Sequence, residues 1–321
     1  MSEGNHVDTN TTNLIGAALL AEIENLQLRA QLAAQGALAG MHRSIRRGTS
    51  IEFSEHKLYS PGDDIRHIDW RAYAKTDRYH IKQFEDETNL TLEILLDHSG
   101  SMRFASDSYS QKIDYSRTIA GALSYLALRQ GDAAGLFAFA DKVSVELLPR
   151  AASTHLLEIL SHLVRLKAEG PTQVGACLNR FAQSRRRRRV IFIISDLFDA
   201  DPSLFTALRH LAARRHDITL LHIMDPAEIN FHFENPSIFA SLEDERRLFV
   251  HPRTLRNAYL NEMKKFLNKT EQLCNEARID YHHIITSTPP EQTLTQILHK
   301  REARVSLRRN VSTPVIVREQ T

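Results

Sequence analysis

Five oxygen-bearing side chains have types and an order along the chain that could together hold a metal ion. Asp97, Ser99 and Ser101 alternate along one short segment, Thr172 follows later, and Asp196 later still. Carboxylate and hydroxyl oxygens are the hard ligands that Mg²⁺ prefers, and Mg²⁺ often needs only one or two carboxylates because it keeps several waters. The five residues therefore predict a site for one divalent cation, Mg²⁺ or another such as Mn²⁺.

Each of these residues also has a simpler explanation, because Asp or Ser after a strand often only caps the next helix. The positions of the two acids favour the metal interpretation. Asp97 follows the apolar run 90–96, and Asp196 follows the apolar run 190–194. In open α/β sheets, ligands bind beyond the carboxyl ends of the strands. With Thr172 on a turn between the two runs, we predict a metal site rather than helix caps.

The elements that must position these side chains alternate between strands and helices. Such alternation predicts an α/β fold, a mostly parallel sheet with helices on both faces. The expected strands are 90–96, 133–139, 143–148, 190–194, 218–224 and 281–286, and the expected helices are 113–128, 155–166, 174–183, 203–215, 255–276 and 291–301.

The chain before the first apolar run has a different pattern. Residues 14–38 repeat apolar side chains at helical spacing and predict one helix that ends near Gly36 or Gly40. This pattern is too short for a coiled coil, so we expect the helix to pack on its own domain. Short β-like pieces follow at Ser50–Phe53 and Tyr79–Phe84. The expected organisation is a disordered tail at 1–13, a small helix and β-rich segment at 14–89, the α/β domain at 90–302 with an irregular insertion near 225–252, and a tail at 303–321.

Composition restricts the classes of partner. Lys plus Arg (41) nearly balances Asp plus Glu (39), and no aromatic residues interleave the basic run Arg185–Arg189. We therefore predict that this run is a solvated surface and that nucleic acid is not a ligand. Two cysteines, no signal-peptide pattern and no apolar run of about 20 residues predict a cytoplasmic protein that does not insert into membranes.

The order Asp97-x-Ser99-x-Ser101, then Thr172, then Asp196 resembles the metal-ion-dependent adhesion site of von Willebrand factor A domains. The upstream stretch resembles a narrower group, the bacterial family called domain of unknown function 58. The motifs that carry this second resemblance are Glu52-Phe53, Tyr59-Ser60-Pro61-Gly62-Asp63-Asp64, Ile68-Asp69-Trp70-Arg71 and Phe84-Glu85, with Asp225-Pro226-Ala227-Glu228 as a later landmark.

The resemblance implies a von Willebrand factor A-like, Rossmann-like fold and a role beside a MoxR-type AAA+ ATPase. The chain would act there as a metal-dependent, protein-binding adaptor or co-chaperone in protein assembly or remodelling. The sequence contains no Gly-x-x-x-x-Gly-Lys-Ser/Thr loop, so the chain is not itself a P-loop ATPase.

Two questions stay open at this stage. The same oxygen-rich site could serve a magnesium-dependent hydrolase, which would need more carboxylates; Asp199 and Asp201 are the acids closest in sequence to Asp196. We expect a binding protein and not an enzyme. The acidic-aromatic segment from Asp63 to Trp70 could be a partner surface, but a turn with a buried Trp is the expectation.

Overall fold

A computed structural model describes residues 9–45, 57–58, 80–81, 90–106, 109–185, 187–198 and 202–311. The chain divides into two units, one formed by residues 1–40 with 90–321 and the other by residues 41–89. In the second unit, β1 (Lys57–Leu58) pairs with β2 (His80–Ile81) in antiparallel register. The expectations for 1–8, Ser50–Phe53, Asp63–Trp70, Asp199 and Asp201 lie outside the described residues.

Six strands of the first unit form one sheet in the order β10-β7-β6-β3-β4-β5. Every pair in this sheet is parallel except β4 with β5, so the expected mostly parallel sheet is confirmed. The strands are β3 (Thr91–Asp97), β4 (Ala133–Phe139), β5 (Val143–Arg150), β6 (Val190–Ser195), β7 (Asp217–Met224) and β10 (Asp280–Ile285).

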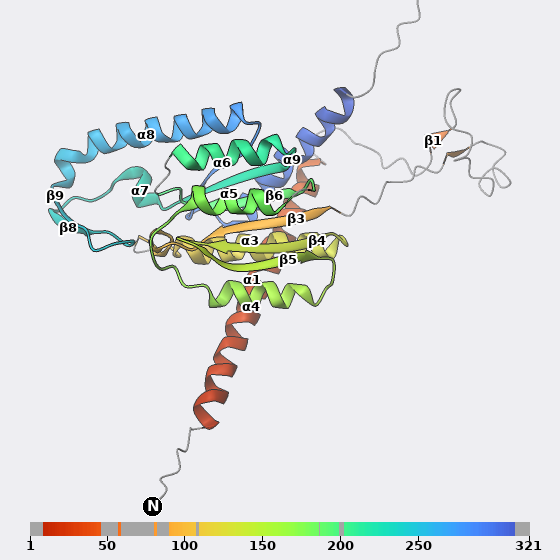
Figure 1. Ribbon diagram of the computed structural model, residues 1–321, viewed down its shortest axis with the longest axis horizontal. Helices are drawn as coiled ribbons and strands as arrows, with labels where there is room; N and C mark the ends of the chain where they lie inside the picture. The colour runs from red at the N-terminus through yellow and green to blue at the C-terminus, as the bar shows by residue number, and fades with distance from the viewer. Residues whose placement is uncertain are drawn as a thin grey trace, which may run out of the picture. The chain divides into compact units, whose positions relative to one another are not determined.

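Helices cover both faces of this sheet, as expected (Figure 1). Leu95 of β3 faces one apolar core, while Ile94 and Leu96 face the other. Successive side chains of a strand point to opposite faces, so a continuous apolar run fits a strand that is buried on both. One face is covered by α1 (Thr9–Ile45), α3 (Lys112–Arg129), α4 (His155–Arg165) and α9 (Pro290–Val311), and the other by α5 (Val174–Ser184), α6 (Pro202–Ala213) and α8 (Pro252–Glu276).

The N-terminal helix α1 packs on its own domain, as predicted, and its Leu26 and Ala30 are buried in the core. It is longer than the sequence indicated, because it starts at Thr9 and continues past both glycines to Ile45. A Cβ at Gly36 would lie 2.8 Å from Cβ of Glu291 in α9, so this glycine allows two helices to approach closely rather than ending one.

Two further segments differ from expectation. Residues 225–252 are not irregular: they form the short helix α7 (Pro226–Asn230) and an antiparallel hairpin of β8 (Ser237–Ala240) and β9 (Arg247–Val250). The last helix, α9, continues to Val311 instead of ending near 301. No helix among the described residues is long and apolar enough to cross a membrane.

Candidate metal centre

The loops after β3 and β6 and the loop before α5 bring together the five residues singled out from the sequence. All five side chains are polar and buried. Asp97 ends a strand, and the other four residues lie outside any strand or α-helix. Their exposed fractions are 0% for Asp97, 0% for Ser99, 4% for Ser101, 5% for Thr172 and 6% for Asp196. Side chains of these types are seldom buried without partners, so the contacts of each one matter.

Asp97, the last residue of β3, is held by neutral donors from the segment that follows β3 and from the end of β6. Its Oδ1 accepts a hydrogen bond from the amide of Ser99 at 2.9 Å, and its Oδ2 accepts one from Oγ of Ser195 at 2.7 Å. The hydroxyls of Ser99 and Ser101 lie 3.1 Å apart. The carboxylate, the two hydroxyls and the end of β6 therefore form one connected polar cluster.

Two glycines allow the loops to approach one another. Gly170 has φ of +81°, a left-handed conformation that side chains rarely adopt, and its carbonyl accepts the Gly100 amide at 2.8 Å. A Cβ at Gly100 would lie 2.1 Å from the carbonyl oxygen of Leu242 in the β8–β9 hairpin. These glycines are consequently required for three loops, from three distant parts of the sequence, to meet at one point.

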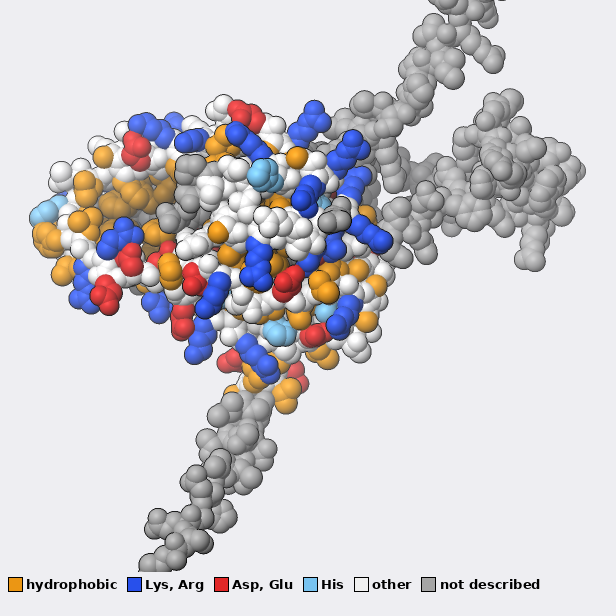
Figure 2. Space-filling view, in the orientation of Figure 1, with side chains coloured by type: hydrophobic (Ala, Val, Ile, Leu, Met, Phe, Trp, Pro, Cys, Tyr) orange, Lys and Arg blue, Asp and Glu red, His pale blue; other side chains and the backbone are white. Residues whose placement is uncertain are grey.

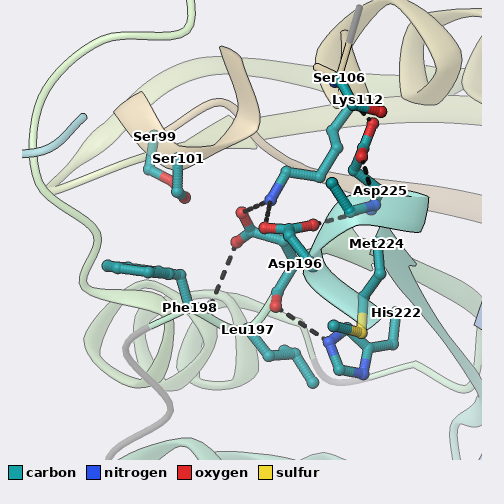
Figure 3. Close-up of polar contacts among 12 residues, drawn as sticks. Ser99, Ser101, Ser106, Lys112, Asp196, Leu197, Phe198, His222, Met224 and Asp225 are labelled. Carbon is teal, nitrogen blue, oxygen red and sulfur yellow. Dashed lines mark hydrogen bonds and ion pairs between the residues drawn. The ribbon is translucent and has the colours of Figure 1, made fainter. Parts of the chain in front are cut away.

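Lys112, at the start of α3, is a member of the site that sequence reasoning missed. Its Nζ lies 2.7 Å from Oδ2 of Asp196 and 2.7 Å from Oε1 of Glu228 in α7, and its side chain is 1% exposed (Figure 3). Burial alone would lower the pKa of Lys112, but the two adjacent carboxylates raise it above its usual value. The ammonium group therefore stays charged.

The site carries more negative than positive charge. The carboxylates of Asp97, Asp196 and Glu228 outnumber the one ammonium, Lys112, which pairs with Asp196 and Glu228. Burial, and then the charge of Asp196, raise the pKa of Asp97 from 3.8 to about 7. A divalent cation would offset this excess of buried carboxylates and favour the ionised form of Asp97.

The donor atoms also fit a hard cation. Oγ1 of Thr172 is buried and has no hydrogen-bond partner among the described residues, although leaving such an atom unpaired costs about 1–3 kcal/mol. No group of three or more His, Cys, Asp or Glu side chains in the described part of the chain forms a metal site. An ion here would thus be held by Asp97 and Asp196 with hydroxyls, the donor set that Mg²⁺ accepts.

The two histidines nearest the loops have structural roles. His98 contacts the carbonyl of Lys167 at 2.8 Å and Oγ of Ser144 at 2.7 Å. His222 contacts the carbonyl of Asp196 at 3.0 Å, and burial together with His283 lowers its pKa to about 3. Both rings use both nitrogens in contacts that hold the loops, and neither is presented to the cluster as a proton acceptor.

A cavity of about 770 Å³ lies beside the cluster. Ser101 and Glu228 belong to its wall, and the rest of its lining is mostly apolar and comes from α7, α8 and the β8–β9 hairpin. Figure 2 shows hydrophobic side chains gathered in a hollow over these elements. Phe198, Leu248 and Leu255 at this cavity are 59%, 64% and 44% exposed, which is unusual for side chains of this size.

The arginine run is not the solvated surface that the sequence indicated. Arg185 is 6% exposed, and its guanidinium pairs with Glu93 at 3.0 Å and with Glu146 at 2.8 Å. Arg189 also pairs with Glu93. Arg188 is exposed, as expected. The prediction was wrong for Arg185 and Arg189 because the buried carboxylate they neutralise comes from β3, far away in sequence.

Three residues near the cluster were not found from sequence: Lys112, Glu228 and Glu243, whose Oε2 accepts the Thr172 amide at 3.1 Å. Glu228 lies in the Asp225-Pro226-Ala227-Glu228 landmark, where it also accepts the Asp225 amide at 2.7 Å in the capping box of α7. That motif was a usable signal for Glu228. Lys112 and Glu243 carry no local signal, since each reaches the site only through tertiary packing.

The fold and the cluster define a class: an α/β protein with a mostly parallel sheet and an acid-hydroxyl cluster at the carboxyl ends of its strands. The family described as "Protein of unknown function DUF58" matches residues 55–267, and the chain belongs to this family. Similar curated proteins include the uncharacterized proteins Mb1516 of Mycobacterium bovis and Rv1480 of Mycobacterium tuberculosis. Each is 26% identical over 214 residues, which cover 66% of this chain and 67% of the relative.

Solved structures with some likeness have lower identity. The conserved hypothetical protein BatB from Bacteroides thetaiotaomicron has a TM-score of 0.44 and 17% identity, covering 66% of this chain and 98% of that one. An aerotolerance-related membrane protein from Bacteroides fragilis has a TM-score of 0.42 and 18% identity, covering 66% and 99%. These scores are too low to carry an argument about function.

Proposed function

We propose that this chain is a metal-dependent, protein-binding adaptor whose sheet is of the von Willebrand factor A type. Its ligand would be an acidic residue of a partner protein, gripped through Mg²⁺ or another divalent cation such as Mn²⁺. The observation that carries the proposal is the buried carboxylate of Asp97, which pairs with no cation among the described residues, beside Asp196 and the unpaired hydroxyl of Thr172.

In this proposal Asp97, Ser99, Ser101, Thr172 and Asp196 hold the ion, and Lys112 and Ser195 orient the two carboxylates. The charge of Asp196 is already shared with Lys112, and the three hydroxyls are neutral, so these ligands would leave part of the ion's positive charge uncompensated. A partner carboxylate can then replace a water on it. Ion and partner should bind cooperatively, each increasing the affinity of the other by the same factor.

The partner that the family resemblance suggests is a MoxR-type AAA+ ATPase, or a client protein delivered to one. The sequence has no P-loop, so any energy for remodelling must come from a second protein. The apolar cavity beside Ser101 supports a protein partner, because exposed apolar side chains next to a polar anchor are typical of interaction surfaces. A cytoplasmic location stays a prediction from the sequence.

The test is co-purification of the MoxR-type ATPase of the same organism with the wild-type chain and with Ser99→Ala/Ser101→Ala. Because the ATPase needs Mg²⁺ itself, chelation with EDTA alone is ambiguous, and the double variant separates the two requirements. The matched control is Ser124→Ala/Ser161→Ala, whose hydroxyls donate only to carbonyls of their own helices.

We expect the site variant to lose at least tenfold in affinity, about 1.4 kcal/mol, while the control keeps wild-type affinity. Equal affinity of all three proteins would contradict the proposal. A hydrolase at the same site would instead turn over phosphodiester, phosphomonoester or peptide substrates without the ATPase and lose that turnover in Asp97→Asn. Such turnover would replace the adaptor proposal.

A further inference from the structure

The tip of the β8–β9 hairpin lies against the candidate metal centre. Oε2 of Glu243 accepts a hydrogen bond from the amide of Thr172 at 3.1 Å. The neighbouring Leu242 carbonyl is so close to Gly100 that no side chain could be accommodated there. The hairpin tip is therefore fitted to both hydroxyl-bearing loops of the site, and it brings a carboxylate to them.

Two buried oxygens at this contact lack partners. Oγ1 of Thr172 and Oε1 of Glu243 are both buried without a hydrogen bond among the described residues. Each unpaired buried oxygen is costly, and finding two on residues joined through the backbone amide of Thr172 indicates a shared cause. A cation accepts lone pairs from hydroxyl and carboxylate oxygens alike, so it would satisfy both.

We propose that Glu243 is the chain's own ligand for the ion, holding in the unbound protein the place that the partner's acidic side chain takes on binding. This inference rests on the proposed function, since Glu243 would occupy the coordination position on the ion that the partner's carboxylate takes on binding. Asp97 and Asp196 cannot play this part, because they are fixed at the ends of β3 and β6.

The hairpin that carries Glu243 is separate from the six-stranded sheet. β8 and β9 pair with each other in a separate two-stranded sheet and with no strand of the six-stranded sheet. The inner side of the hairpin, including Phe239 and Val250, lines the apolar cavity, while Ile238 on β8 is 65% exposed. Removing Glu243 from the site would break its hydrogen bonds with Thr172 and Ser101 but no strand pairing of the sheet that carries the aspartates.

The experiment measures binding of Mn²⁺ alone, from the electron paramagnetic resonance signal of the free ion, to the full chain and three variants. Glu243→Gln keeps an oxygen that can accept the Thr172 amide but removes the charge. Asp244→Asn is the matched control, since it removes a charge from the same tip, where the Asp244 carboxylate contacts Arg246 and Ser241 of the hairpin itself. Asp97→Asn tests the site itself.

We expect Glu243→Gln to weaken Mn²⁺ binding about tenfold, and excess acetate to restore most of that loss by supplying the missing carboxylate. Asp244→Asn should bind Mn²⁺ with the affinity of the wild type, and acetate should change the Mn²⁺ affinity of neither protein. If Glu243→Gln binds Mn²⁺ as tightly as the wild type while Asp97→Asn loses Mn²⁺ binding, this inference is wrong but the proposed metal site is supported. Absence of Mn²⁺ binding to the wild type would overturn both.

Discussion

Glu93 and Asp97 lie on the same strand, β3, and both are 0% exposed, but their electrostatic surroundings differ. Burial raises the pKa of both carboxyls. At Glu93 the guanidinium groups of Arg185 and Arg189 act against that rise, whereas at Asp97 the next contribution is the charge of Asp196, which adds to it. Glu93 thus has two cationic partners from the chain, whereas the cation near Asp97, Lys112, pairs with Asp196 and Glu228.

This difference separates a structural charge from a functional one. A buried carboxylate with its own cations contributes to the fold, and removal of a partner leaves an uncompensated charge. A buried carboxylate that the chain leaves undercompensated, in a loop cluster at the carboxyl edge of the sheet, is instead typical of a ligand site. The following predictions test whether the two ends of β3 behave in these two ways.

The largest expected effect is at the paired end. Arg185→Met should lower the free energy of unfolding by about 3–5 kcal/mol, because Glu93 then keeps only Arg189 as a partner. Chemical denaturation measures this, and the exposed Arg188→Met is the matched control, expected within about 0.5 kcal/mol of wild type. Equal stability of the two variants would show that Glu93 does not depend on its arginines.

At the other end of β3, Asp97→Asn should not lower the free energy of unfolding of the ion-free protein. In EDTA at pH 8 the variant should be at least as stable as the wild type, because it removes a buried charge that lacks a cation. Saturating Mg²⁺ should stabilise the wild type by about 2–3 kcal/mol at a hundredfold excess over Kd, and the variant not at all. Denaturation with and without Mg²⁺ measures both, and equal Mg²⁺ stabilisation of the two proteins would remove Asp97 from the site.

Without a bound ion, the free energy of unfolding of the wild type should change by roughly 2 kcal/mol with pH, because Asp97 titrates differently in the folded and unfolded states. The pKa of Asp97 is raised from 3.8 to about 7 in the folded protein, so folding takes up a proton between these values. The cost of the ionised group is fully present above pH 7 and is relieved as the pH falls toward 4.

In EDTA the wild type should therefore gain stability relative to Asp97→Asn between pH 8 and pH 5. Mg²⁺ affinity should change in the opposite direction, falling about tenfold per unit below pH 7, because the ion must displace that proton. If the difference in free energy of unfolding between the two proteins does not change with pH, the pKa of Asp97 is not raised.

The smallest expected effect concerns Ser195, which donates to Oδ2 of Asp97 at 2.7 Å. Ser195→Ala should weaken Mg²⁺ binding about tenfold, because the carboxylate loses the group that orients it. Ser124→Ala is a control of equal burial, with a hydroxyl that donates only within α3. Calorimetric titration with Mg²⁺ compares them, and unchanged binding by Ser195→Ala would mean that the Ser99 amide alone positions Asp97.

Much of the fold followed from the sequence because it depends on local pattern. The apolar run before Asp97 required a strand buried on both faces, and the alternation of such runs with helical stretches required a mostly parallel sheet. The helix ends were harder. Gly36 and Gly40 would terminate an isolated helix, but in the protein they face Glu291 and Thr295 of α9 at close range.

The sequence by itself determined that Asp97 and Asp196 stand at the ends of parallel strands, because strand period and strand end are local properties. Only the tertiary structure decided which charges meet there. Lys112 reaches Asp196 from the start of α3, Glu228 reaches Lys112 from α7, and Glu243 reaches Thr172 from a hairpin tip. Long-range packing brings these groups together. The free energy of burying their charges depends on neighbours that are far apart along the chain, so a local sequence pattern cannot predict it.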